Sequence, residues 1–364
     1  MRGFVGLLAA LAVAAPASAA VTAKVGLVTS QTGTASTLSV TQRQGAQLAV
    51  DELNAAGAVR LTLEERDDTS TGDGAKAAFE DLIGGGANVL LGPTLSASAF
   101  VADPVAQAAG VPVLAISNTA DGITEQGDHI FRASLAERRQ VAGAVRLAHR
   151  KFMFKRPVMI TRTDQPFAVS GAKAFRSTFK AVGTPIVKEA SYEGVPPSFT
   201  AMLKFLAKAK PDVLIIESLT EGPQLMQAAR RTKGLTKVRL MGGNAFNSLS
   251  VIKAAGAAAE GLIVGAAWHP SEPGAASRGF VTRFKTRFGT TPDQFAAQAY
   301  TAVLAVADAL GRAGSADSAA LRDALAGTRG LASPLGSFGF GASRNVTTTG
   351  IVQVVRNGAF RLLR

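Results

Sequence analysis

The stretch that decides the fold is Lys24–Gly57, KVGLVTSQTGTASTLSVTQRQGAQLAVDELNAAG. It opens with the apolar run Lys24–Thr29, which predicts a buried strand, and a loop rich in Gly, Ser and Thr follows. Apolar residues then recur at i, i+3, i+4 and i+7 from Ala46 to Leu53, which places them on one face of a helix that ends at Gly57. A buried strand followed by an amphipathic helix is the unit from which parallel sheets are built.

The same alternation of strands and helices continues along most of the chain. In the first half, the further predicted strands are Leu61–Glu65, Val89–Gly92 and Val113–Ile116. A second series contains the predicted strands Pro157–Thr161, Val213–Ile216 and Val238–Gly242. Alternation of this kind builds parallel sheets with right-handed crossovers, so we expect an α/β fold with two doubly wound lobes.

The C-terminal region has a different pattern. Its predicted helices are Ser277–Phe288, Pro292–Ala313 and Ala319–Ala326. The strands Thr349–Arg356 and Ala359–Leu362 follow, joined by Asn357-Gly358, which is a strong hairpin signal. Because this region is too fragmented for a third domain, we expect it to complete both lobes, which requires the chain to cross between them several times.

Residues 1–20 have the features of a cleaved secretory signal peptide. Arg2 supplies a positive start, Gly3–Ala15 is a short apolar stretch, and Ala17–Ala20 offers small residues for cleavage. The apolar stretch is too short for a membrane span of about 20 residues, although an uncleaved anchor or a buried helix is the alternative. Removing 20 of 364 residues leaves about 344, which exceeds what one core usually serves. We therefore expect a soluble, two-domain protein of the periplasm.

The net charge of +13 raises the question of nucleic-acid binding. The Lys and Arg residues are scattered, and their densest cluster, Arg146–Arg156, lies at a predicted helix end, where cations oppose the helix dipole. We therefore expect no nucleic-acid partner, while a basic surface that attracts anions or anionic lipid headgroups stays open. The chain has no Cys, which excludes a disulfide, a thiol nucleophile and a thiolate metal site.

Loops rich in hydroxyl groups follow several predicted strands, at the edge where open parallel sheets bind ligands. These loops are Ser30–Thr37, Gly92–Ser98 and Ser117–Ala120. Ser96, with the backbone N–H groups of Ala97 and Ser98 behind it, can hold a carboxylate at a helix start. Thr119 can reach the same anion from the neighbouring strand. The alternative is that Ser96 or Ser98 only caps the helix.

The sequence contains no convincing catalytic or metal-binding pattern. His129, His149 and His269 lie in unrelated segments without the spacing of metal ligands. Gly84–Gly86 lies at a predicted helix end, so it indicates a turn and not a phosphate-binding loop, and there is no GxSxG motif. The acidic pair Asp67–Asp68 is more typical of a solvated loop than of an acid and base. We expect no enzymatic activity, no cofactor and no metal.

Five stretches together carry a resemblance to a known family. They are VGLVTSQTGTAS, GAQLAVDELNAAG, NVLLGPTLSASAF, GVPVLAISNTADGIT and TPDQFAAQAYTAVLAVADAL, with the acidic pair after the second strand between them. In this order and spacing, the chain resembles the branched-chain amino-acid-binding (Leu/Ile/Val-type) substrate-binding proteins of ABC transporters. The resemblance covers essentially all of the chain after the signal peptide.

This resemblance implies a periplasmic-binding-protein type I fold, with two Rossmann-like lobes joined by three crossovers. The implied N-terminal lobe is 21–136 plus 268–337, and the implied C-terminal lobe is 137–267 plus 338–364. In the family, a serine and a threonine placed like Ser96 and Thr119 bind the ligand's α-carboxylate, aided by backbone groups near Ala97 and Asn118. The other implied ligand contacts come from the loop Ala35 to Leu38 and from an aromatic residue placed like Phe167.

One position departs from the family's pattern. The acidic residue that pairs with the ligand's ammonium aligns with Asn244, and an amide cannot replace the charge of a carboxylate. A buried ammonium without a counterion costs several kcal/mol, roughly as a broken buried ion pair does. Either another acid, such as Glu217, takes over this role, or the ligand carries no ammonium. An aromatic or aliphatic carboxylate or an amide is then the ligand. The disulfide of some family members is also missing.

By resemblance, the expected function is capture of an amino acid or related small carboxylate for an ABC importer. The expected partner is the membrane permease, and we expect the protein to be a monomer in the periplasm. The alternatives are a ligand-sensing domain that partners a membrane receptor, and a hydrolase. The sequence does not decide whether Trp268, near a predicted crossover, lines the cleft or packs in the core.

Overall fold

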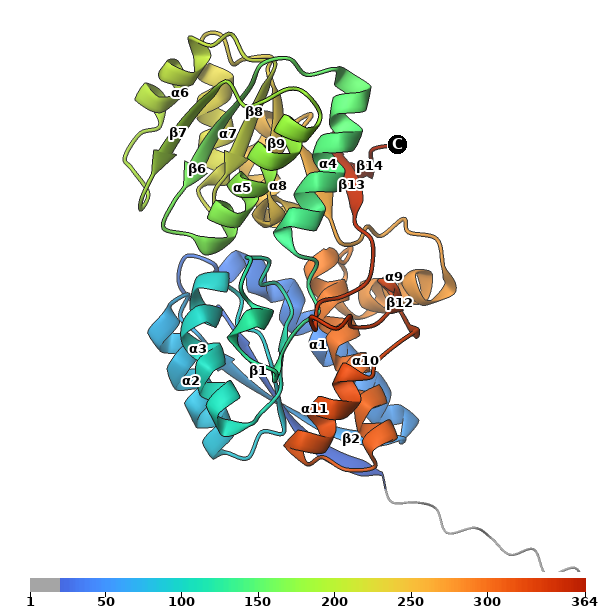
Figure 1. Cartoon of the computed structure of the whole chain (residues 1–364). Coiled ribbons are helices and arrows are strands. Elements are labelled where there is room, and N and C mark those ends of the chain that lie inside the picture. The colour runs from blue at the N-terminus through green and yellow to red at the C-terminus, as the bar shows by residue number, and fades with distance from the viewer. Residues whose placement is uncertain (1–19) are drawn as a thin grey trace, which may run out of the picture.

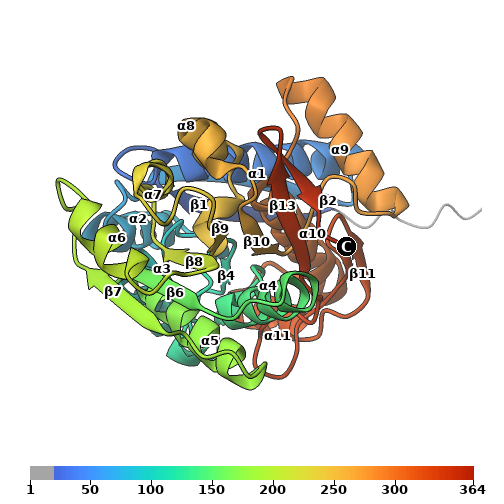
Figure 2. The same cartoon turned by 90° about the horizontal axis from the view of Figure 1, so that it is seen from above.

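The computed structural model describes residues 20–364 and shows two α/β lobes, one above the other in Figure 1. Each lobe has a central, mainly parallel sheet that is covered by helices on both faces (Figure 2). The predicted signal peptide, residues 1–20, falls almost entirely outside the described residues. Across residues 20–364, the helices include none that is long and apolar enough to cross a membrane.

The described part of the first lobe contains a five-stranded parallel sheet with the order β2-β1-β3-β4-β5. Its strands are β1 (Val21–Thr29), β2 (Val59–Asp67), β3 (Val89–Leu91), β4 (Val113–Ala115) and β5 (Ile130–Arg132). The helices between them are α1 (Ser36–Ala56), α2 (Gly72–Gly84), α3 (Ser96–Ala109) and the short η1 (Thr124–Gln126). The four strands predicted here are confirmed, whereas β5, with two apolar residues before Arg132, was not predicted.

The second lobe is built on a sheet with the order β14-β13-β10-β9-β8-β6-β7, in which β13 and β14 are antiparallel. Its strands are β6 (Pro157–Arg162), β7 (Lys188–Tyr192), β8 (Val213–Glu217), β9 (Arg239–Gly242), β10 (Ile263–Ala266), β13 (Ile351–Arg356) and β14 (Ala359–Leu362). Its helices are α4 (Glu137–Phe152), α5 (Pro166–Ala181), α6 (Thr200–Ala207), α7 (Gly222–Arg231), α8 (Leu249–Ala255), and the 3-10 turns η2 (Asn244–Asn247) and η3 (Gly256–Ala259). In Figure 2, α4 and α5 cover one face of this sheet, and α7 and α8 cover the other.

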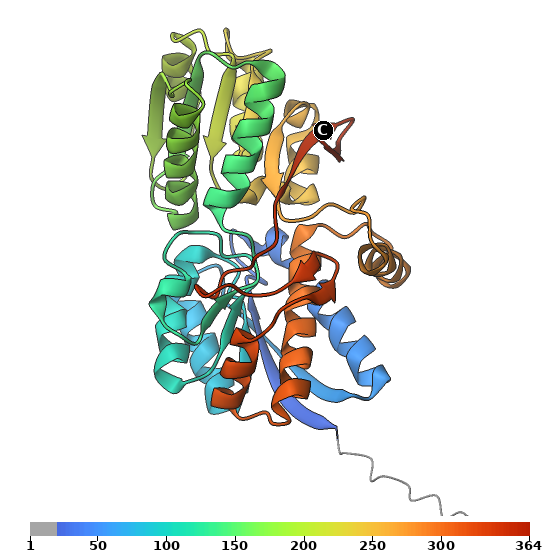
Figure 3. The ribbon, with the colours of Figure 1, turned by 45° about the vertical axis from the view of Figure 1, so that its right-hand side comes forward.

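The chain passes between the lobes three times, as Figure 3 shows. The connecting stretches are 133–136, 267–274 and 339–350. Between the last two, the chain adds α9 (Ala275–Phe288), α10 (Gln294–Ala313), α11 (Ser318–Ala326), β11 (Leu331–Ser333) and β12 (Gly336–Phe338). The C-terminal region therefore completes both lobes, as expected, and the Asn357-Gly358 hairpin has both residues at positive φ. The residue numbers assigned above to the two lobes stay a prediction.

Helices α1 and α10 pack against each other at a glycine, and this contact positions one wall of the interlobe region. At Gly45 of α1, a Cβ atom would overlap the backbone carbonyl of Ala296 on α10. The neighbouring residues Ala46 and Ala49 are also fully buried and have small side chains. The backbones therefore approach closely, because glycine and alanine place little between them.

We predict that Gly45→Ala lowers the stability of the protein although alanine is the better helix former. The added methyl group must push α1 and α10 apart, and overpacking of this kind typically costs about 1–3 kcal/mol. The matched control is Gly311→Ala on α10, where nothing lies within 4 Å of the added atom. In this control, the higher helix propensity of alanine should raise the free energy of unfolding by up to about 1 kcal/mol. Urea unfolding of the variants measures both effects, and equal gains at the two positions would contradict the packing argument.

Candidate functional site

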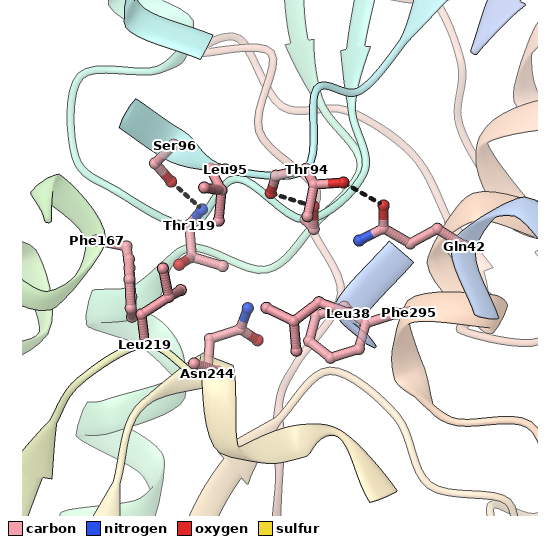
Figure 4. Close-up of a pocket in the computed structure, with 12 residues that line it drawn as sticks. Leu38, Gln42, Thr94, Leu95, Ser96, Thr119, Phe167, Leu219, Asn244 and Phe295 are labelled. Carbon is pink, nitrogen blue, oxygen red and sulfur yellow. Dashed lines mark hydrogen bonds between the residues drawn. The ribbon is translucent and has the colours of Figure 1, made fainter. Parts of the chain in front are cut away.

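A cavity lies between the two lobes, where loops and helix starts follow strands of both sheets (Figure 4). The space free of atoms in it is about 330 Å³, part of which is open to solvent. Its lining comes from both lobes and consists of Leu38, Gln42, Thr94, Leu95, Ser96, Ser117, Thr119, Phe167, Leu219, Asn244, Ala245 and Phe295. The cavity therefore suits a small ligand that touches both lobes.

Five of the residues expected to bind ligand line this cavity together: Leu38, Ser96, Thr119, Phe167 and Asn244. The other four lie next to it and not in its lining: Ala35, Ala97, Asn118 and Glu217. Ala35 is buried at the start of α1, and the Asn118 side chain donates a hydrogen bond to the Pro93 carbonyl. The expected roles of all nine residues stay predictions.

Ser96 is the first residue of α3 and points its hydroxyl toward the loop after β4. The Ser96 Oγ accepts hydrogen bonds from the backbone N–H groups of Thr119 at 3.2 Å and Ala120 at 3.4 Å. The N-cap position is Leu95, and it makes no side-chain capping bond, so the alternative of Ser96 or Ser98 as a simple cap is wrong. Because the oxygen of Ser96 already accepts, its own proton remains available for an acceptor in the cavity.

The Thr119 hydroxyl contacts a carboxyl group that the sequence did not point to. The Thr119 Oγ1 donates to Oε2 of Glu137 at 2.5 Å, and the other oxygen of Glu137 accepts from the Asn244 backbone N–H at 2.9 Å. Glu137 is the first residue of α4, directly after the first crossover, and is fully buried. It therefore links the Thr119 loop of the first lobe to the Asn244 loop of the second. Burial raises the pKa of Glu137 to about 7.

Glu217 lies at the end of β8, behind the cavity. Neither of its carboxyl oxygens has a hydrogen-bond partner among the described residues. A Cβ atom on Gly243 would lie 2.6 Å from Oε2 of Glu217 and 2.7 Å from Oε1 of Glu137, so both carboxyl groups face the same glycine. Burial, with the nearby charge of Glu137, raises the pKa of Glu217 well above its ordinary value. Glu217 is thus a buried, easily protonated acid outside the lining of this cavity.

The acidic pair Asp67–Asp68 shapes the loop after β1. Asp68 accepts hydrogen bonds from the Ser30 hydroxyl and from the backbone N–H of Ser70, and Asp67 accepts from the hydroxyl of Thr32. Although burial acts to raise it, hydrogen bonds led by that of Thr32 leave the pKa of Asp67 lowered. Burial raises the pKa of Asp68. The pair therefore orders the loop that leads into α1.

Trp268 and His269, both singled out in the sequence, are buried and contact other parts of the protein core. Trp268 is buried, donates its indole N–H to the Ser277 hydroxyl and packs edge-on against Phe280, so it lies in the core and not in the lining of the cavity. His269 is also buried and contacts the backbone oxygen of Phe360. Within residues 20–364, no group of three or more His, Asp or Glu side chains is arranged to hold a metal.

We predict that Glu217→Gln changes how stability depends on pH. The pKa of Glu217 is raised above 4.5 in the folded state, so the folded protein holds a proton that the unfolded chain releases once the pH exceeds 4.5. Wild-type stability therefore falls as the pH rises from 4.5 to the folded-state pKa, by about 1.4 kcal/mol per pH unit for one group. The Gln variant has no such titrating group, so its free energy of unfolding should increase relative to that of wild type as the pH rises.

The test is urea unfolding at about pH 4, 6 and 8, which begins below the ordinary carboxyl pKa of 4.5 and extends well above it. The control is Glu80→Gln, because Glu80 is an exposed residue of α2. It should follow the wild-type curve. Parallel pH curves for Glu217→Gln and wild type would contradict the assignment of a protonated, buried Glu217.

Comparison with known proteins agrees with this architecture. A relative from Pseudomonas aeruginosa, a leucine-, isoleucine-, valine-, threonine- and alanine-binding protein, is 26% identical over 344 residues, which cover 92% of this chain and 90% of the relative. A branched-chain amino acid transporter substrate binding protein from Streptococcus pneumoniae, solved with isoleucine, has a TM-score of 0.86 at 25% identity and covers 93% of this chain and 97% of its own. A solute binding protein of an ABC transporter from R. palustris, solved with benzoate, has a TM-score of 0.84 at 24% identity. The match covers 94% of this chain and 95% of that protein's chain.

The family model for periplasmic binding proteins matches residues 22–359, nearly all of the described chain. The matched region contains both sheets except most of β14 and the first residue of β1, all three crossovers and every residue that lines the interlobe cavity. The chain belongs to the periplasmic binding protein family.

Proposed function

We propose that this protein is the solute-binding component of an ABC importer and that it captures a small carboxylate between its lobes. The observation that carries the proposal is the interlobe cavity, to which the first lobe contributes the Ser96 hydroxyl and the second contributes Phe167 and Asn244. The relatives that are named for amino-acid binding or were solved with isoleucine or benzoate support a small carboxylic acid as the ligand class. The export signal expected at residues 1–20 supports a place in the periplasm.

The carboxylate end of the ligand is assigned to Ser96 and the start of α3. The Ser96 hydroxyl is already held by two backbone N–H groups, so its proton points to an acceptor without further reorganisation. The N–H groups at the start of a helix add a favourable field for an anion. The apolar side chains of Leu38, Phe167 and Leu219 surround the rest of the cavity and suit the carbon skeleton.

Ligand binding is coupled to closure of the two lobes. The three connecting stretches are the only covalent links between the lobes within the described chain, so they are the hinges about which the lobes move. A ligand that contacts both lobes binds the closed form more tightly and shifts the equilibrium toward it by that difference. The closed, liganded monomer then presents a defined surface to the membrane permease, and release follows reopening.

We predict that Ser96→Ala weakens binding of a carboxylate by about 1.5–3 kcal/mol, the worth of one hydrogen bond to a charged group. The Thr119 hydroxyl donates its proton to Glu137 and has none left for the ligand, so it is not part of this prediction. Isothermal titration calorimetry with leucine, 4-methyl-2-oxopentanoate and benzoate measures the change for whichever acid binds wild type. Ser98→Ala is the matched control, since the Ser98 hydroxyl is buried, has no partner in residues 20–364 and is not in the cavity lining. Unchanged affinity in Ser96→Ala would refute the carboxylate assignment.

A further inference from the structure

Gln42 of α1 points an amide N–H group into the cavity from the first lobe (Figure 4). The orientation of this amide is set by a short chain of hydrogen bonds. The Ser30 backbone N–H donates to Thr94 Oγ1 at 3.0 Å, and Thr94 Oγ1 donates to Gln42 Oε1 at 3.1 Å. The Gln42 Nε2 is then left buried, with no hydrogen-bond partner among the described residues.

Asn244 also points an amide N–H group into the cavity, from the second lobe. The Ala267 backbone N–H donates to Gln294 Oε1 at 2.8 Å, and Gln294 Nε2 donates to Asn244 Oδ1 at 2.6 Å. The Asn244 oxygen is therefore occupied, and Figure 4 shows its amide nitrogen directed into the cavity. The side chain of Asn244 offers the ligand a donor and not an acceptor.

The orientation of the Asn244 amide is determined by a backbone N–H, which can only donate. Flipping Gln294 would set its NH₂ against the Ala267 N–H, and flipping Asn244 would set two NH₂ groups against each other. At Gln42, flipping the amide would remove the Oε1 acceptor of the Thr94 hydroxyl proton and turn an oxygen toward the cavity. The Asn244 donor is therefore a property of the fold, and the Gln42 donor follows from its hydrogen bond with Thr94.

The cavity also lacks a counterion for a cation. Among the described residues that line it, none is acidic. The nearby carboxyl groups of Glu137 and Glu217 lie behind the lining, where Glu137 accepts from Thr119 and Asn244 and Glu217 is fully buried. An ammonium group in this cavity would meet amide donors, hydroxyl groups and apolar carbons, and it would lose its water without a counterion in return.

We propose that Gln42 and Asn244 form a subsite for an oxygen acceptor, and that the ligand is a carboxylic acid with a second oxygen function and no ammonium group. The second oxygen is that of a carbonyl, a hydroxyl or a second carboxylate. The assignment rests on the proposed function, since it takes the ligand's first carboxylate to bind at Ser96. An oxygen function that accepts from both amides also ties the two lobes together, because α1 belongs to the first lobe and η2 to the second.

The first test compares acids that share a skeleton and differ at one group. The aliphatic series is 4-methyl-2-oxopentanoate, 4-methylpentanoate and leucine, and the aromatic series is 4-hydroxybenzoate, benzoate and 4-(aminomethyl)benzoate. Calorimetry on the wild-type protein should give the tightest binding for the oxygen-bearing acid, by about tenfold or more over the unsubstituted acid. The ammonium-bearing acid should bind most weakly.

The second test reverses the polarity of the subsite. Asn244→Asp keeps an oxygen for Gln294 to donate to and turns the other oxygen, an acceptor, toward the cavity. Gln42→Glu makes the same change from the opposite lobe, so it serves if Asn244→Asp does not fold. In either variant, the oxygen-bearing acid should lose about tenfold or more in affinity and the ammonium-bearing acid should gain. The control is Asn54→Asp, which adds the same charge on α1 outside the cavity lining and should leave the order unchanged.

The outcomes separate this inference from the proposed function. Tightest wild-type binding of leucine or 4-(aminomethyl)benzoate overturns the acceptor subsite and leaves the solute-binding role standing. An unchanged order in both polarity-reversing variants also overturns it. Failure of all six acids to bind the wild-type protein overturns the carboxylate-binding function, and the subsite falls with it.

Discussion

The close contact of α1 with α10 at Gly45 and Ala296 holds the polar lining of the cavity in place. Gln42 lies on α1 three residues before Gly45, and Gln294 lies on α10 two residues before Ala296. The amide side chains of Gln42 and Gln294 therefore belong to two helices whose backbones are in contact. Little side-chain volume lies between these helices, so neither can move without displacing the other. Since Gln42 accepts from the Thr94 hydroxyl and Gln294 accepts from the Ala267 backbone N–H, the donor pattern depends on this helix pair staying in register.

The carboxyl groups near the site, those of Glu137 and Glu217, are not part of the cavity lining. Glu137 and Glu217 face the same glycine, and both are fully buried in the second lobe beside the first crossover. Burial favours the protonated form of both carboxyl groups and outweighs the hydrogen bonds to Glu137 and the nearby charge of Arg132, which is why their pKa values rise. The lining itself consists of neutral amides, hydroxyls and apolar carbons. The selectivity of the cavity therefore depends on which way its hydrogen bonds point, and less on net charge.

Much of the fold was accessible from the sequence, but some strands were missed. β5 has only two apolar residues before Arg132, and β7 at the sheet edge is largely polar, so neither shows the apolar run that marks β3 and β4. In the site, Ser96 and Thr119 could be found because hydroxyls follow strands at the binding edge of a parallel sheet. Gln42 carried a signal that was overlooked: it lies between Leu38 and Ala46 on the apolar face of α1, and a polar residue there needs a reason.

By itself, the sequence determined the α/β class, the two series of strands and helices, the return of the C-terminal region to both lobes, and the strand ends where a ligand belongs. These follow from periodicity and turn chemistry, which are local along the chain. Only the tertiary structure decided that Glu137 contacts Thr119, that Glu217 lies behind the cavity, and that Gln294 orients Asn244. Such pairings join residues that are far apart in the chain, and the direction of an amide depends on a partner that spacing cannot reveal.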